Sequence, residues 1–179
     1  HRLRGAVAGA DPFPAMGRYC QKVIGEEVRH RLREDYGIDH PDGICACVGG
    51  GSNAIGVMNA FLDDPRVSLY GFEAGGHGPE SGEHAIRFAP GTGRLGVFQG
   101  TKSYLLEHDE GQTRDTYSIS AGLDYPSVAP EHARPKELGR ATYSWATDDE
   151  PLPAPQHLCQ PSLLYPSDAA DPAARLPLR

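Results

Sequence analysis

The sequence predicts an α/β fold built on a parallel-sheet βαβ core, and three observations support this prediction. Residues 43–48 are an apolar run without charge, which is typical of a strand buried on both faces of a parallel sheet. Three glycines end that run, and residues 54–62 then carry apolar side chains at helical spacing before Asp63. A second apolar strand is predicted over residues 67–72, so that strand, glycine turn, helix and strand form one βαβ unit.

The segment before this unit predicts a connector followed by a helix. Residues 1–15 are rich in glycine, alanine and proline, and Pro12 and Pro14 predict a stretch without regular structure. From about Met16 to Tyr36, apolar residues recur every three or four positions, which predicts an amphipathic helix that ends at Gly37.

Downstream of residue 72 the pattern becomes irregular. Glycine is dense from residue 73 to residue 100, and no periodicity predicts a regular element there. The polar residues 107–112 predict a hairpin or lid tip, and residues 120–132 predict a loop. Residues 151–179 hold seven of the sixteen prolines, which predicts a disordered or non-native tail.

The composition argues against several classes of protein. The 179 residues carry a formal net charge of -7 at pH 7, so the chain has no basic field to attract nucleic acid or an anionic membrane. No apolar run reaches the roughly 18 residues that cross a bilayer, and the first residues lack the layout of a signal peptide. We therefore expect a cytoplasmic protein with no nucleic-acid or membrane partner.

The cysteines do not indicate a metal site or a disulfide framework. Their spacing matches neither a zinc CxxC pair nor an even distribution, which predicts buried thiols in a reducing compartment: Cys20, Cys45, Cys47 and Cys159. Likewise, His77, Glu80, Glu83 and His84 lack the HExxH spacing, which favours a structural loop over a transition-metal site.

The glycine turn at residues 49–53 predicts a phosphate site. Successive glycines between a strand and a helix can bring several backbone N–H groups to one point, and Ser52 and Asn53 can add side-chain donors. The turn fits neither the GxxxxGK[ST] loop nor the GxGxxG fingerprint. A helix packed closely on a strand explains a bare run of three glycines equally well, so the spacing alone leaves both interpretations open.

Four blocks of sequence, in order, resemble the tryptophan synthase beta chain family. They are CACVGGGSNAIG (45–56), GFEAGGHGPESGEH (71–84), GVFQGTKSYLL (96–106) and YSISAGLDYPSVAPEH (117–132). The resemblance extends over about residues 1–150 and implies an incomplete three-layer βαβ core of the type II fold of pyridoxal-phosphate enzymes. It further implies that residues 1–21 end an amino-terminal domain and its connector, and that residues 22–150 are part of the carboxy-terminal cofactor-binding domain.

The resemblance also implies a cofactor and its ligands. The cofactor is pyridoxal 5'-phosphate, and the residues that would hold its phosphate are Gly49, Gly50, Gly51, Ser52 and Asn53. Cys47 and Gly122 would lie near the cofactor ring, and Asp124 would act in catalysis by engaging a closing lid. A monovalent cation, Na+ or K+, would bind backbone carbonyls of Gly49, Tyr125 and Ser127.

The function implied by the resemblance is the last step of tryptophan biosynthesis. L-Serine and indole would be the substrates of a β-replacement, and an alpha chain and a second beta chain would be the partners. The family's cofactor-binding lysine follows a histidine, a context that Lys22, Lys102 and Lys136 lack, so we expect this chain alone to be inactive. Two alternatives stay open: another type II pyridoxal-phosphate lyase or synthase, and a non-catalytic phosphate-binding module.

Overall fold

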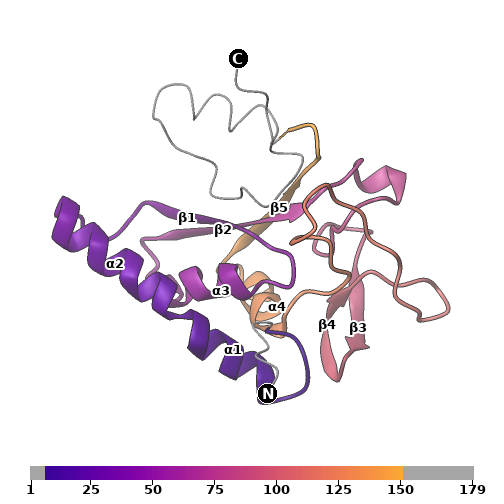
Figure 1. The fold of residues 1–179 in the computed structure, drawn as a ribbon, viewed down its shortest axis with the longest axis horizontal. Coiled ribbons are helices and arrows are strands. Elements are labelled where there is room, and N and C mark those ends of the chain that lie inside the picture. The colour runs from indigo at the N-terminus through magenta and orange to yellow at the C-terminus, as the bar shows by residue number, and fades with distance from the viewer. Residues whose placement is uncertain (1–6, 151–179) are drawn as a thin grey trace.

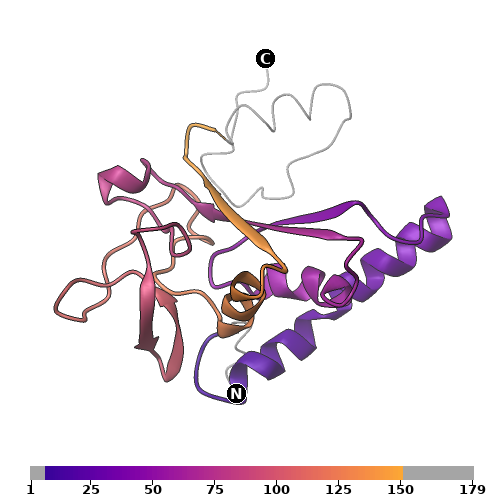
Figure 2. The same cartoon turned by 180° about the vertical axis from the view of Figure 1, so that it is seen from behind.

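The computed structural model describes residues 7–150, which form two sheets and four α-helices (Figures 1 and 2). The elements in chain order are α1 (Phe13–Gln21), α2 (Val23–Tyr36), β1 (Gly43–Cys47), α3 (Ser52–Met58), the 3-10 helix η1 (Asn59–Phe61), β2 (Ser68–Ala74), the 3-10 helix η2 (Pro79–Ser81), β3 (Arg94–Phe98), β4 (Thr101–Leu105), α4 (Pro130–Glu137) and β5 (Thr142–Ala146).

A parallel sheet in the order β1-β2-β5 forms the centre of the fold. Its register pairs Gly43 with Ser68 across β1 and β2, and Tyr70 with Thr142 across β2 and β5. Because α3 and η1 connect β1 to the parallel strand β2, the structure confirms the βαβ unit predicted over residues 43–72. The α/β fold class with a parallel core is therefore confirmed.

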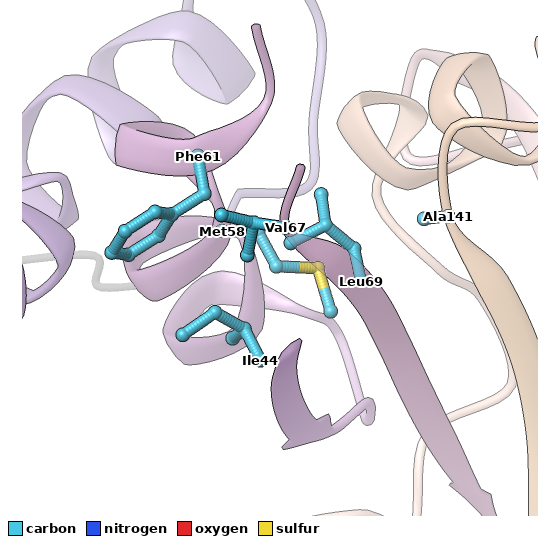
Figure 3. Packing of buried hydrophobic residues seen from close by; sticks show 6 residues of the cluster. All are labelled: Ile44, Met58, Phe61, Val67, Leu69 and Ala141. Atoms are coloured by element: carbon cyan, nitrogen blue, oxygen red, sulfur yellow. The ribbon is translucent and has the colours of Figure 1, made fainter. Parts of the chain in front are cut away.

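All four α-helices lie on one face of this sheet, as both views show (Figures 1 and 2). On that face the side chains of the sheet and of the α3 segment pack into one buried cluster (Figure 3): Ile44, Met58, Phe61, Val67, Leu69 and Ala141. Burial of this apolar surface is the main force that fixes α3 on the sheet. Of the three layers expected, the described residues supply two, a sheet and one layer of helices.

The opposite face of the sheet is open in the described part of the chain. Tyr70 and Phe72 of β2 are 39% and 37% exposed, and Cys45 and Cys47 of β1 are exposed beside them. The prediction that the first strand is buried on both faces is therefore wrong for residues 7–150. The prediction of buried thiols is also wrong for these two cysteines and for Cys20, which lies exposed on α1, whereas Cys159 is outside the described residues.

The amino-terminal helix differs from its prediction at its start and in its middle. It begins at Phe13 because Pro14 lies in the first turn, where the missing N–H of proline breaks no hydrogen bond. It is divided into α1 and α2 at Lys22, next to the point where Gln21 contacts α3. The predicted end is confirmed, since Gly37 caps α2 with a left-handed φ of 67°.

The strand β3 lies within residues 73–100, for which no regular element was predicted, and pairs with β4 just after that segment in an antiparallel hairpin. Its two turn residues, Gln99 and Gly100, both have positive φ, 51° and 79°, as a type I′ turn requires. The predicted tip at residues 107–112 is confirmed as a turn, because the His108 N–H donates to the Gln112 carbonyl at 2.7 Å.

No helix among residues 7–150 is long and apolar enough to span a membrane. The predicted tail, residues 151–179, lies outside the described residues. The division between two family domains at residue 21 stays a prediction.

Candidate phosphate site

The glycine turn lies at the carboxyl end of β1, where ligands commonly bind to parallel sheets. Gly49 and Gly50 follow the strand, and Gly51 precedes α3 with a φ of 95°, a left-handed conformation that favours glycine. A Cβ at Gly51 would also overlap the imidazole ring of His132. Glycine at residue 51 is therefore required both by the backbone conformation and by the close approach of His132.

Every carbonyl from residue 48 to residue 51 accepts a hydrogen bond from the interior of the protein. The Arg87 Nη2 atom donates to the carbonyls of Val48 and Gly49 at 2.6 and 3.0 Å. The Ala129 N–H donates to the Gly50 carbonyl at 3.1 Å. The Gly51 carbonyl lies 2.7 Å from the Nε2 atom of His132 and also accepts the first hydrogen bond of α3.

The positions of these carbonyls determine where the amides of the turn point. The Asp11–Pro12 bond is the cis peptide of the described residues, so the peptides of the turn are trans. In a trans peptide the C=O and the following N–H point in opposite directions, so the N–H groups of residues 49–52 point away from the interior. Within residues 7–150, the amides of residues 49–54 donate no hydrogen bond. The turn thus holds a row of amide donors that have no acceptor among residues 7–150.

A buried ion pair supports the turn from below. Arg87 and Glu73 have side chains 0% and 1% exposed, and the Arg87 Nε lies 2.8 Å from the Glu73 carboxylate. Glu73 also accepts the backbone N–H groups of Arg87 and Phe88. Burial lowers the pKa of Arg87 and raises the pKa of Glu73, whereas their mutual contact opposes both shifts. We treat the pair as charged, because a carboxylate that accepts three N–H donors is well stabilised.

His132 holds the other end of the turn and is neutral at pH 7. Its Nε2 must carry the proton, because the Gly51 carbonyl can only accept a hydrogen bond. Its Nδ1 then accepts the hydroxyl proton of Tyr143 at 2.8 Å. Burial lowers the pKa of His132 to about 4, and the nearby Arg87 charge acts in the same direction. Sequence reasoning did not find these roles, because His132 and Tyr143 lie far from the turn in the chain.

Some of the residues that the sequence predicted around the turn lie close to it in the structure. A Cβ built at Gly49 would be 2.7 Å from the Gly122 carbonyl oxygen, and one built at Gly50 would be 3.9 Å from the Tyr125 ring. Cys47, at the end of β1, has a pKa raised by burial although its surface is exposed. Asp124 is exposed and makes no ion pair or hydrogen bond with residues 7–150.

The carbonyls expected to bind a monovalent cation do not fit that ion. The Gly49 carbonyl accepts from Arg87 Nη2 at 3.0 Å, and the Tyr125 carbonyl accepts from Arg87 Nη1 at 2.5 Å. The third residue, Ser127, is buried and forms an antiparallel bridge with Leu105, the last residue of β4. A guanidinium therefore contacts two of the three oxygens that the cation would need.

Neither of two cavities in the described part of the chain includes the glycine turn. They have volumes of about 290 and 490 Å³, and both are lined by Pro130 and Glu131 at the start of α4. Gly49 and Gly51 of the turn are buried and Gly50 is half-buried, whereas Asn53 and the neighbouring Gly122 are exposed. In the loop from His77 to His84, the Nδ1 atom of His77 lies at hydrogen-bond distance, 2.8 Å, from the Glu83 carboxylate.

Comparison with known proteins identifies relatives over most of the chain. No protein-family model matches it. The tryptophan synthase beta chain of Mycobacterium leprae (strain TN) is 51% identical over 164 residues, which are 91% of this chain and 38% of the relative. That of Xanthomonas campestris pv. campestris (strain B100) is 53% identical over 150 residues, 84% of this chain and 36% of the relative. The chain thus spans a little over a third of the length of the curated relatives it matches.

Proposed function

Because this chain is homologous to part of the tryptophan synthase beta chains, we propose that its glycine turn holds the phosphate of pyridoxal 5'-phosphate. The observation that supports the proposal is the row of amides at residues 49–54 that donate no hydrogen bond within residues 7–150, of which those of residues 49–52 point away from carbonyls held in the interior. Successive backbone N–H groups with no internal partner are suited to a phosphate dianion. In the intact protein this site serves the synthesis of L-tryptophan from L-serine and indole.

The residues of the turn divide the binding task among them. The amides of Gly49, Gly50 and Gly51 bind the phosphate oxygens through N–H groups that no Cβ shields. Ser52 and Asn53 add a hydroxyl and an amide, neither of which has another hydrogen-bond partner in residues 7–150. The bound cofactor would supply an electron sink to the reaction. The chain's own residues would hold it, with Cys47 and Gly122 as the residues expected near its ring.

Other parts of the proposal concern the intact enzyme. Asp124 lies exposed two residues after Gly122, so its carboxylate is accessible to a closing lid. The partners are a tryptophan synthase alpha chain and a second beta chain, and the location is the cytoplasm. None of the chain's lysines, Lys22, Lys102 and Lys136, follows a histidine as the family's cofactor-binding lysine does, so these residues would hold the cofactor without a covalent bond and without turnover.

A charge placed in the turn tests the phosphate site. Gly50 tolerates a side chain sterically, since the nearest atom to its Cβ would be 3.9 Å away. We expect Gly50→Asp to weaken binding of pyridoxal phosphate and of inorganic phosphate to the full chain at least tenfold, which is about 1.4 kcal/mol. The reason is repulsion between the carboxylate and the phosphate. Calorimetric titration would measure both affinities.

Gly50→Asn is the matched control, because asparagine has the size of aspartate without its charge. If both variants weaken phosphate binding equally, the side chain acts through its size and the predicted charge repulsion is wrong. If Gly50→Asp leaves the affinities unaltered, the phosphate site is refuted. A second control is Gln112→Asp, at the exposed turn before Thr113. It gives the chain the same net charge as Gly50→Asp but places the added carboxylate away from the site.

Substrate specificity separates the proposal from its alternatives. The intact protein is expected to join L-serine and indole, whereas another type II lyase or synthase would prefer threonine or a sulfide. A phosphate-binding module would bind pyridoxal phosphate and turn over none of these substrates. Steady-state assays with each substrate pair would decide between the three.

A further inference from the structure

We infer that the Arg87 guanidinium takes the place of a monovalent cation beneath the glycine turn, so that this chain's phosphate site does not depend on Na+ or K+. The starting observation is the mismatch at the expected cation ligands. Two of those carbonyls, of Gly49 and Tyr125, accept hydrogen bonds from the two terminal nitrogens of Arg87. The inference deepens the proposed phosphate site and rests on it for its functional meaning.

The guanidinium holds carbonyl oxygens together, as a small cation would at this position. It draws together three carbonyls from two separate segments, those of Val48 and Gly49 after β1 and that of Tyr125 in the loop before α4. Its planar fork fixes the direction of each hydrogen bond, which a spherical ion does not. The carbonyls of residues 48 and 49 are thereby oriented so that the next two amides point outward.

A second cation at the same oxygens is disfavoured by charge and by space. Arg87 is 0% exposed, so no bulk water separates its charge from an ion bound to the Gly49 and Tyr125 oxygens. The one buried carboxylate at this position, Glu73, already accepts the Nε of Arg87 at 2.8 Å and two backbone amides. No negative charge among the described contacts of Arg87 remains to balance an additional ion.

The experiment compares salts at equal ionic strength. The full chain would be studied in potassium, sodium and tetramethylammonium chloride, because tetramethylammonium is too large to bind carbonyl oxygens within the fold. We expect the thermal midpoint of the wild type to be the same in the three salts, and its affinity for pyridoxal phosphate to vary less than twofold. A wild-type affinity or midpoint that rises in potassium or sodium, by fivefold or more for the affinity, overturns the inference.

Arg87→Met is the informative variant, since methionine fills part of the space and leaves the carbonyls and Glu73 free to bind an ion. We expect its midpoint to become higher in potassium or sodium than in tetramethylammonium, and its affinity for pyridoxal phosphate to differ at least fivefold between them. A folded variant that shows no such difference also overturns the inference. Arg87→Lys is the control that keeps the charge, and it should remain insensitive to the salt.

Two measures keep the outcome decisive. If Arg87→Met does not fold, Arg87→Gln, which also removes the positive charge and keeps the Glu73 carboxylate to balance an ion, is measured in its place with the same expected and refuting results. The midpoints require no ligand, so they test the inference even if pyridoxal phosphate fails to bind in every salt. That last result would refute the proposed function and leave the cation inference to be decided by the midpoints.

Discussion

Acidification provides a direct test of the network that holds the glycine turn. His132 is buried between the Gly51 carbonyl, 2.7 Å from its Nε2, and the Tyr143 hydroxyl, 2.8 Å from its Nδ1. Burial lowers its pKa from 6.5 to about 4 in the folded chain, and the hydrogen bond to Gly51 opposes that shift without overcoming it. Protonation would place a charge where Arg87 already provides one, so the folded state resists it.

The sign and size of the effect follow from the two pKa values. Between pH 6.5 and about 4 the unfolded chain binds a proton at residue 132 that the folded chain does not bind. The stabilisation from neutral His132 is therefore complete above pH 6.5 and is lost as the pH falls through that window. At about 1.4 kcal/mol per pKa unit, the gap amounts to roughly 3 kcal/mol in the free energy of unfolding.

Urea unfolding at a series of pH values between about 7.5 and 4.5, followed by circular dichroism, would measure this loss. His132→Gln is the control, because its amide can donate to the Gly51 carbonyl but does not titrate in this range. Carboxylates that stabilise the fold, such as Asp64 with its pKa lowered by Arg66, affect both proteins and cancel in the comparison. We expect the wild type to lose roughly 2 to 3 kcal/mol more than the variant. Parallel pH profiles for the two proteins would refute the reasoning.

Two further sets of substitutions test the support of the turn. Gly51→Ala should lower the free energy of unfolding by more than about 2 kcal/mol, because it adds strain at positive φ to an overlap with His132. Gly139→Ala, at a φ of 66° with open space around it, should cost only about 1 kcal/mol by the same chemical denaturation. Glu73→Gln and Arg87→Met should each cost about 3 to 5 kcal/mol, since each leaves a buried charge without its partner. Their double variant should cost clearly less than the sum, and additive losses in this double-mutant cycle would mean that the two charges do not interact.

The predicted elements that match the structure are those with a local cause. The strand at Gly43–Cys47 and the strand at Ser68–Ala74 begin and end within two residues of the predicted bounds. Apolar runs, glycine and proline act on the backbone within a few residues, so the sequence contains their effect directly. The end of α2 at Gly37 is of the same kind.

The errors arose where a distant contact or a covering layer decided the outcome. Cys45 and Cys47 have apolar neighbours in the chain, yet they are exposed because the four helices of the described residues lie on the other face of the sheet. The strand β3 was missed because it lies in a glycine-rich segment and depends on pairing with β4; its Leu95 and Val97 are 51% and 71% exposed and so do not anchor it in the core. The division of the first helix occurs where Gln21 contacts α3.

The sequence by itself determined the βαβ unit, the place of the glycine turn within it and, through four ordered blocks, the resemblance to an enzyme family that its relatives support. Only the tertiary structure decided which groups hold the turn. Arg87 and His132 reach its carbonyls from 38 or more residues away in the chain. Hydrogen bonds between buried polar groups depend on how the elements pack and have no periodic signature, so the outward direction of the amides became visible only in the folded chain.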